Sequence, residues 1–199
     1  MIAPRTYIFR RYTVERVLVA LGMPLVLPFM ALVAIAVRLS SRGPALFRQE
    51  RPGIEGGTFV IIKFRTMFID TCNAGRLSTA RHDERVTPLG RALRRTHIDE
   101  LPQLWNVVCG DMSLIGPRPE PVPDARAYEQ SVVGYGERRC VRPGLTGWAQ
   151  IRLGYTDDEA GARKKLELDL HYIRNASLGL DARILAGTVR ELLLRRNSR

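Results

Sequence analysis

The feature that most constrains this chain is a long apolar segment close to its N-terminus. From Val17 to Val37 the sequence contains no charged residue, and a straight helix of this length rises about 31 Å, enough to span a bilayer. A cleavable signal peptide needs a small-residue cleavage site after its apolar run, whereas the basic stretch from Arg38 to Arg42 follows here. A buried core helix is the other alternative, but a helix that is apolar on every face needs lipid or a large protein around it. The segment therefore predicts a membrane helix.

Two prolines and the flanking charges bear on how this helix meets the membrane. Pro24 and Pro28 each remove a backbone hydrogen bond and are expected to break or bend the helix. The two flanks carry equal numbers of arginines, which favours a cytosolic position for both ends: Arg5, Arg10, Arg11 and Arg16 before the segment, and Arg38, Arg42, Arg48 and Arg51 after it. A re-entrant helix over about residues 13–40, which bends at the prolines and returns through the same leaflet, satisfies both constraints. An ordinary kinked transmembrane helix is the alternative.

Length, charge and cysteine content limit the class of protein. A chain of 199 residues suits one domain (1–199), with residues 41–199 as its cytosolic catalytic part. The net charge of +11 indicates polyanionic partners, namely nucleic acid, anionic lipid headgroups or phosphorylated substrates. Cys72, Cys109 and Cys140 are widely spaced, which fits neither a disulfide framework nor a zinc site. The sequence also lacks a P-loop and the GxGxxG, HExxH and GxSxG motifs.

The remaining pattern predicts an α+β fold that is mostly helical with a small β-hairpin. Strands are expected at 45–50 and 58–64, with glycines 53, 56 and 57 in the turn between them. Helices are expected at 87–95, 101–108, 125–138, 159–174 and 181–196, with loops at 70–86 and 116–123 and a tight turn at 142–148. The last helix has an apolar face flanked by arginines, which fits either an interfacial amphipathic helix or packing on the core: Ile184, Leu185, Val189, Leu192 and Leu193.

The densest group of chemically active side chains lies in RALRRTHIDELPQLWNVV. Thr96 has the spacing of a helix cap, so Asp99 and Glu100 are expected at a helix N-terminus, where the dipole keeps acids ionised and attracts phosphate. Acids at helix starts are often simple caps. Arg94 and Arg95 directly upstream favour instead a site that handles phosphate and a divalent metal.

Two further basic motifs follow. In GDMSLIGPRPE, Arg118 is fixed between two prolines, where it can offer a two-pronged donor to phosphate or stand solvated on a rigid loop. In RRCVRPGLTGWAQI, Arg142 precedes a Pro-Gly turn. Arg138, Arg139 and Arg142 equally fit a surface basic run, and Trp148 fits either base stacking or the core.

Together these motifs resemble the monotopic phosphoglycosyl transferases, the bacterial sugar transferase family that starts glycan assembly on polyprenyl phosphate. Four motifs occur in the family's order over about Arg10 to Leu193: LFRQERPG, IKFRTM, RRTHIDELPQLWNVVCGDMSLIGPRPE and RPGLTGWAQI. Many members carry a larger membrane or soluble portion ahead of this core, and we expect this chain to have only the core.

The resemblance implies a role for each matching residue. Asp99 is the implied nucleophile, Glu100 is its partner, and Mg²⁺ is expected at this dyad. Arg94 and Arg118 match basic positions near the substrate phosphates, and Arg142 belongs to the turn associated with the nucleotide-sugar.

The same resemblance covers the membrane helix. Pro28 matches the proline that breaks the re-entrant helix. Leu27 stands where serine is common, so a polar contact at the break is missing, and Pro24 is expected to compensate. His97 also stands where serine is common.

The activity implied is transfer of a sugar-1-phosphate from a UDP-sugar to undecaprenyl phosphate. The products are polyprenyl diphosphate-sugar and UMP, formed through an aspartyl phosphosugar, as the first membrane step of exopolysaccharide, O-antigen or glycoprotein assembly. A carboxylate with an ordinary pKa near 4 is ionised at neutral pH, so the nucleophile needs no base. The expected location is the cytosolic face of a bacterial inner membrane, with membrane lipids but no nucleic acid as partners, and a homodimer left open.

The rival hypothesis is a basic protein of the membrane surface that binds lipid or nucleic acid without catalysis. It accounts for the charge and for the apolar segment. It does not account for paired acids among the arginines, because acids weaken the binding of polyanions.

Overall fold

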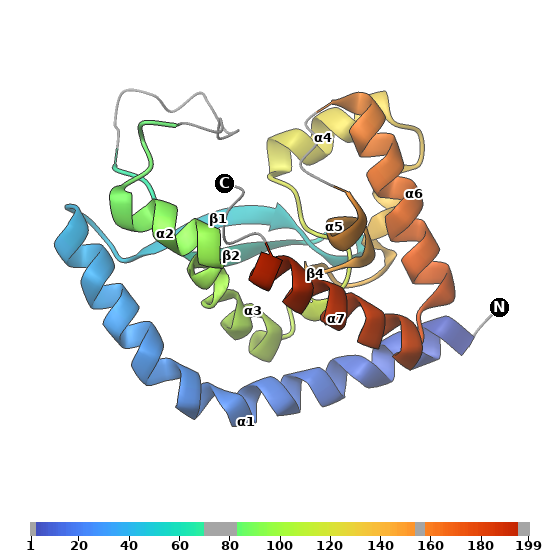
Figure 1. Cartoon of the computed structure of the whole chain (residues 1–199). Coiled ribbons are helices and arrows are strands. Elements are labelled where there is room, and N and C mark those ends of the chain that lie inside the picture. Colours follow the sequence, from blue (N-terminus) through green and yellow to red (C-terminus); the bar gives the residue numbers. More distant parts are fainter. Residues whose placement is uncertain (1–2, 70–82, 154–157, 195–199) are drawn as a thin grey trace.

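The computed structural model describes residues 3–69, 83–153 and 158–194 and is mostly helical with two small sheets (Figure 1). The predicted loop at 70–86 and the predicted helix end at residue 196 lie largely outside these residues. In chain order the elements are α1 (Ala3–Ser40), β1 (Leu46–Pro52), η1 (Ile54–Gly56), β2 (Thr58–Phe64), α2 (Pro88–Thr96), η2 (Ile98–Glu100), α3 (Gln103–Cys109), β3 (Ser113–Ile115), α4 (Val122–Ser131), η3 (Tyr135–Cys140), β4 (Gly144–Thr146), α5 (Trp148–Arg152), α6 (Glu159–Asn175) and α7 (Leu178–Leu194).

The apolar segment lies within one long helix, α1, which continues through Pro24 and Pro28. Figure 1 shows it bent in its middle rather than interrupted, so the prolines curve this helix without ending it. Only 6% of its most apolar window is buried, and Leu21 and Leu25 are 72% and 84% exposed. A core helix would be buried on every side, so that alternative is wrong. By length and composition α1 can cross a membrane.

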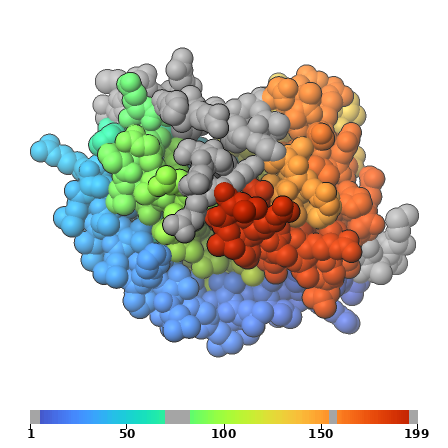
Figure 2. All heavy atoms as spheres, in the orientation of Figure 1, coloured from blue at the N-terminus to red at the C-terminus, as the bar shows by residue number. Residues whose placement is uncertain are grey.

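A narrow stripe of α1 nevertheless packs on the rest of the molecule along its whole length. Ile8 and Tyr12, near its beginning, join a core cluster with Tyr172 and Ile184. Val37, near its end, joins a second cluster with Phe64 and Leu93. Both ends of α1 therefore contact the same body, and the space-filling view shows α1 as the lower rim of the molecule beneath α7 (Figure 2).

The predicted hairpin is confirmed. β1 and β2 pair antiparallel, with Phe47 opposite Lys63 and Arg51 opposite Phe59. Because side chains alternate between the two faces of a strand, Phe47, Arg51, Phe59 and Lys63 share one face. The glycine-containing turn between the strands holds η1.

The predicted start of α2 is also confirmed, because the Thr87 side chain accepts a hydrogen bond from Gly90 N at 2.8 Å and Pro88 lies in the first turn. A side chain at Gly90 would lie 2.0 Å from the Thr66 carbonyl oxygen, so only glycine allows α2 to pack this closely on the end of the hairpin.

The tight turn expected at 142–148 is wrong, because residues 144–146 form β4 and pair parallel with β3. A side chain on Gly144 would lie 2.1 Å from Gly116 N, and Gly144 N donates to Pro117 O at 2.9 Å. Two motifs that look separate in the sequence are therefore one packed unit.

The helix expected at 125–138 is two pieces, α4 and η3. The left-handed φ of 78° at Gly134 breaks it, and α4 begins at Val122, inside the expected loop. The last helix begins at Leu178 instead of residue 181. Within it Ile184 is fully buried in the core, whereas Leu185, Val189, Leu192 and Leu193 are exposed. An interfacial position for α7 stays a prediction.

Candidate active site

The two acids lie in a tight 3₁₀ turn, η2, between α2 and α3. α2 ends at Thr96, and its C-cap His97 has a left-handed φ of 55° that turns the chain. Asp99 and Glu100 follow after Ile98. A positive φ is uncommon for a residue with a side chain, so this turn holds local strain beside the acids. The predicted cap at Thr96 is wrong, since its hydroxyl donates to the Ala92 and Leu93 carbonyls inside α2. The acids precede α3 as predicted, but a strained turn positions them.

Glu100 is held by two cations. Lys63, reaching from the face of the hairpin, places Nζ 2.9 Å from Oε1. Arg118 donates to Oε2 at 3.2 Å from Nη1 and to Oε1 from Nη2. Burial alone would raise the pKa of Glu100, but Arg118 and Lys63 outweigh it and hold the pKa below its usual range. Glu100 is therefore a permanent carboxylate.

Asp99 has the opposite surroundings. Its side chain is 8% exposed, and within the described residues its carboxylate makes no hydrogen bond or ion pair. Burial raises its pKa and the charge of Glu100 adds to the rise, while Lys63, His97 and Arg94 oppose it. The expectation of an ordinary pKa is wrong for this reason. A carboxylate that is poorly solvated and has no partner is more nucleophilic than a paired one, so of the two acids Asp99 fits the role of nucleophile better.

The other predicted residues lie at different distances from this pair. Arg94 donates from Nε to Thr66 Oγ1 at 2.8 Å, and its charge acts on Asp99. Arg118 contacts Glu100 directly. The side chain of Arg142 points elsewhere, because its guanidinium lies 4.6 Å from the ring centroid of Tyr12 on α1. The backbone N–H of Arg142 donates to the Tyr12 hydroxyl at 2.8 Å. The structure thus brings Asp99, Glu100, Arg94 and Arg118 together, and it places Arg142 against α1.

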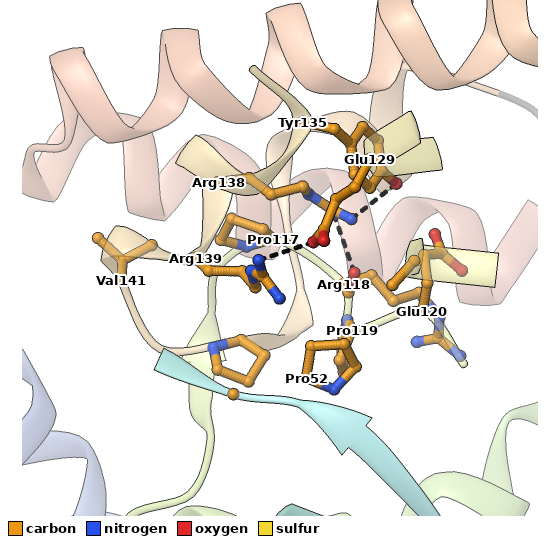
Figure 3. A pocket seen from close by; sticks show the side chains of 13 residues that line it. Pro52, Pro117, Arg118, Pro119, Glu120, Glu129, Tyr135, Arg138, Arg139 and Val141 are labelled. Atoms are coloured by element: carbon orange, nitrogen blue, oxygen red, sulfur yellow. Dashed lines mark hydrogen bonds and ion pairs between the residues drawn. The ribbon is translucent and has the colours of Figure 1, made fainter. Parts of the chain in front are cut away.

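Arg138 and Arg139 line a small cavity together with Arg118, but the two residues have different partners (Figure 3). Arg138 is 5% exposed and pairs with Asp169 on α6, so its interpretation as a surface residue is wrong. Arg139 pairs with Glu129, and both of those side chains are 31% exposed.

The dyad alone does not make a complete metal site. Both oxygens of Glu100 already accept hydrogen bonds, and the described residues contain no group of three or more His, Cys, Asp or Glu that could hold a metal ion. Mg²⁺ is commonly bound by one or two carboxylates together with substrate phosphates. The acids therefore fit a magnesium ion that also takes ligands from a diphosphate substrate.

Sequence reasoning missed Lys63 and Arg51, which both extend from the hairpin toward the site. Arg51 Nη1 donates to Pro119 O at 2.8 Å. Burial and the neighbouring Arg118 lower the pKa of Arg51 to about 10. A usable signal was present, because both residues lie in motifs shared with the family; their common face follows only from the observed strand, which extends to Pro52, and its register.

Comparisons with known proteins identify the family of the chain. The profile described as "Bacterial sugar transferase" matches residues 6–195. The chain is 40% identical over 94% of its length to an Aeromonas hydrophila protein named UDP-N-acetylgalactosamine-undecaprenyl-phosphate N-acetylgalactosaminephosphotransferase, of which it covers 44%. It is 43% identical over 87% of its length to an Escherichia coli UDP-glucose:undecaprenyl-phosphate glucose-1-phosphate transferase, of which it covers 38%.

A shorter relative is covered more fully. The chain is 42% identical over 95% of its length to a Caulobacter vibrioides UDP-glucose:undecaprenyl-phosphate glucose-1-phosphate transferase, of which it covers 72%. It thus spans less than half of the first two relatives and most of the third. The match of the profile over nearly the whole chain confirms the resemblance of the motifs, and the chain belongs to the bacterial sugar transferase family.

Proposed function

We propose that this protein transfers a sugar-1-phosphate from a UDP-sugar to undecaprenyl phosphate through a covalent intermediate on Asp99. The observation that carries the proposal is the contrast within the acidic pair: Glu100 is bound by Lys63 and Arg118, while Asp99 has no partner among the described residues. The names of the relatives support the donor and acceptor classes. Release of UMP and a role in exopolysaccharide, O-antigen or glycoprotein assembly follow from the same resemblance.

The reaction proceeds in two displacements. In the first, an Asp99 carboxylate oxygen attacks the sugar-bearing phosphorus of the donor, and the bond from that phosphorus to the bridging oxygen breaks, so UMP leaves with the electron pair. In the second, an oxygen of the lipid phosphate attacks the same phosphorus. The bond to Asp99 breaks, the carboxylate is restored and the lipid diphosphate-sugar departs.

Positive charge makes the approach of two anions feasible. Arg118, Lys63 and Arg94 surround the acids and can stabilise charge on the transferring phosphoryl group. Asp99 and Glu100 would also hold Mg²⁺, which neutralises diphosphate charge when bound. Arg142 is assigned to the nucleotide-sugar by the family resemblance, and β4, which follows it, hydrogen-bonds to the Arg118 loop through Gly144 N and Pro117 O.

We also propose that α1 is re-entrant, with the body of the protein on the cytosolic face of the inner membrane and in contact with its lipids. The two ends of α1 pack on one body, and the helix bends near its prolines (Figure 1). A spanning helix would place its ends on opposite sides of the bilayer. The exposed apolar side chains of α1 need a lipid surface in either case.

Incubating purified protein with donor alone tests the chemistry. The covalent scheme predicts at most one equivalent of UMP and a labelled protein, whereas direct attack by the lipid predicts no UMP until lipid is added. Asp99→Asn must abolish the label, and Glu100→Gln should slow labelling without moving it. A confirmed turnover with no phosphosugar adduct on Asp99 in mass spectra would contradict the covalent scheme. No UMP under any condition would favour the non-catalytic binding hypothesis.

Labelling of engineered cysteines in intact cells tests the topology. In a chain without its native cysteines, Arg10→Cys and Arg42→Cys flank the apolar segment, and both positions are exposed. The re-entrant helix predicts that neither reacts with an impermeant reagent from outside. Reaction at one position alone would establish a spanning helix. Replacing Pro24 and Pro28 together by alanine should shift the helix toward that state, because it restores the missing hydrogen bonds.

A further inference from the structure

The loop that carries Arg118 is anchored at three successive residues by three cations from distant parts of the chain. Arg138 Nη2 donates to the Arg118 carbonyl at 2.9 Å, and Arg51 Nη1 donates to the Pro119 carbonyl at 2.8 Å. Lys165 on α6 pairs with the Glu120 carboxylate. A loop between two prolines is already stiff, so this anchoring specifies where the Arg118 guanidinium lies rather than whether the loop is ordered.

Arg138 differs from the other two anchors because it is itself fixed. Its Nε and Nη2 lie 2.9 and 2.6 Å from Asp169 Oδ2, and its Nη1 donates to the Tyr135 hydroxyl at 3.0 Å. Each guanidinium nitrogen has a protein partner, as the close-up of the cavity shows for Tyr135 and Arg118 (Figure 3). Arg138 is 5% exposed, and Asp169 is 1% exposed. Arg138 therefore does not reach a substrate.

Such a buried pair needs an explanation beyond stability. Replacing a buried ion pair by apolar residues of similar volume is often neutral or stabilising, so stability alone is weak grounds for its presence. What this pair adds is a connection: Asp169 on α6 orients Arg138, Arg138 holds the Arg118 backbone, and Arg118 pairs with Glu100.

We propose that Arg138, oriented by Asp169, is a positioning residue that sets the placement of Arg118 in the reaction. This proposal rests on the function proposed above, in which Arg118 stabilises charge on the transferring phosphoryl group. Phosphoryl transfer depends mainly on positioning and electrostatic stabilisation, and a misplacement of about 1 Å can cost as much as a hundredfold in rate.

Removing both members of the pair separates positioning from folding. The double variant Arg138→Met with Asp169→Leu leaves no buried unpaired charge, and the leucine fills part of the space that the guanidinium vacates. We expect its thermal unfolding midpoint to stay close to wild type, while the rate of UMP release in a single turnover with UDP-sugar falls about tenfold. Arg139→Met is the matched control, because Arg139 lines the same cavity and pairs with Glu129, and within the described residues no hydrogen bond or ion pair joins it to the Arg118 loop. It should keep the wild-type rate.

A double-mutant cycle with Arg118→Lys measures whether the loss of rate caused by the pair replacement depends on Arg118, which a purely structural role would not require. If Arg138 acts through Arg118, the pair replacement should lower the rate by less than about twofold in the Arg118→Lys background. A full tenfold loss in that background would overturn the proposal, as would a stable pair variant with the wild-type rate or an equal loss in Arg139→Met.

Two safeguards keep the outcomes distinct. If the double variant unfolds, Arg138→Lys replaces it, because lysine keeps a cation beside Asp169 but cannot bind Asp169, the Tyr135 hydroxyl and the Arg118 carbonyl together. A loss of rate that appears when Arg118 is present, and not in the Arg118→Lys background, then supports the proposal. Wild-type protein that releases no UMP contradicts the proposed function itself. Active wild-type protein with an unaffected pair variant contradicts only the positioning role of Arg138.

Discussion

Two groups of charged side chains that pack on the core differ in what they leave unpaired. The first, called the catalytic cluster after the function proposed above, consists of Lys63, Asp99, Glu100 and Arg118. The anchoring cluster joins α1 to β3, α6 and α7 and consists of Arg11, Glu15, Ser113, Tyr172 and Asp181.

In the anchoring cluster every acid has partners. Glu15 pairs with Arg11 at 3.0 Å and accepts from Ser113 Oγ at 2.6 Å, while Asp181 pairs with Arg11 at 2.9 Å. The acidic and basic side chains there are at most 10% exposed, whereas Arg118 in the catalytic cluster is 30% exposed. A satisfied, closed cluster fixes the position of a helix; a more open cluster with one unpaired acid has capacity left for a substrate.

The largest expected effect on turnover is at Asp99, the unpaired acid of the catalytic cluster. Asp99→Asn should lower turnover by at least about a thousandfold, because an amide cannot form the phosphosugar intermediate. The thermal unfolding midpoint should not fall, since the change removes a buried carboxylate that has no described partner and whose pKa burial raises. Differential scanning fluorimetry in detergent alongside the UMP assay measures both. A large loss of stability would mean that Asp99 holds the fold together instead.

The reverse pattern is expected in the anchoring cluster. Arg11→Met leaves Glu15 and Asp181 buried without their cation, which typically costs about 3–5 kcal/mol. Thermal unfolding should shift accordingly, while the activity of the remaining folded protein is retained. Arg16→Met is the control, because Arg16 makes one exposed contact from the same helix, to the Val108 carbonyl. Equal destabilisation by both variants would contradict the special role of Arg11.

Arg118→Lys tests the geometry of the catalytic cluster at constant charge. Lysine cannot reproduce the two-pronged contact of Arg118 with Glu100, so the barrier should rise by about 2 kcal/mol, roughly thirtyfold in rate. Single-turnover UMP release measures it. Arg139→Lys, at the edge of the neighbouring cavity, should leave the rate unchanged. Wild-type turnover in Arg118→Lys would mean that the guanidinium of Arg118 has no part in the reaction.

Sequence reasoning found the parts of this molecule that local chemistry specifies. The hairpin follows from alternation and turn glycines, and the start of α2 follows from Thr87 and Pro88. The acids and Arg118 stand out because their motifs are dense in charge. The β3–β4 pair escaped notice because strands of three residues have no readable alternation and their partners lie far apart in the chain.

What sequence reasoning missed was pairing at long range. Arg138 looks like one of several surface arginines, and its burial depends on Asp169, 31 positions later. Arg11 likewise looks like a membrane-flanking charge until α7 brings Asp181 against it. Nothing local to either arginine distinguishes it from an exposed neighbour such as Arg10.

The smallest expected effect tests whether the anchoring cluster is only structural. Tyr172 is 1% exposed, donates to Asp181 Oδ1 at 2.9 Å and accepts a hydrogen bond from Arg11. Tyr172→Phe keeps the ring and creates no large cavity, and Asp181 keeps its contact with Arg11. The cost should therefore be about 1 kcal/mol, or roughly 2–4 °C in the unfolding midpoint, with turnover unchanged. A Tyr172→Phe protein that keeps its stability but loses turnover would give this cluster a part in the reaction, and satisfied pairing would then no longer distinguish an anchor from an active site.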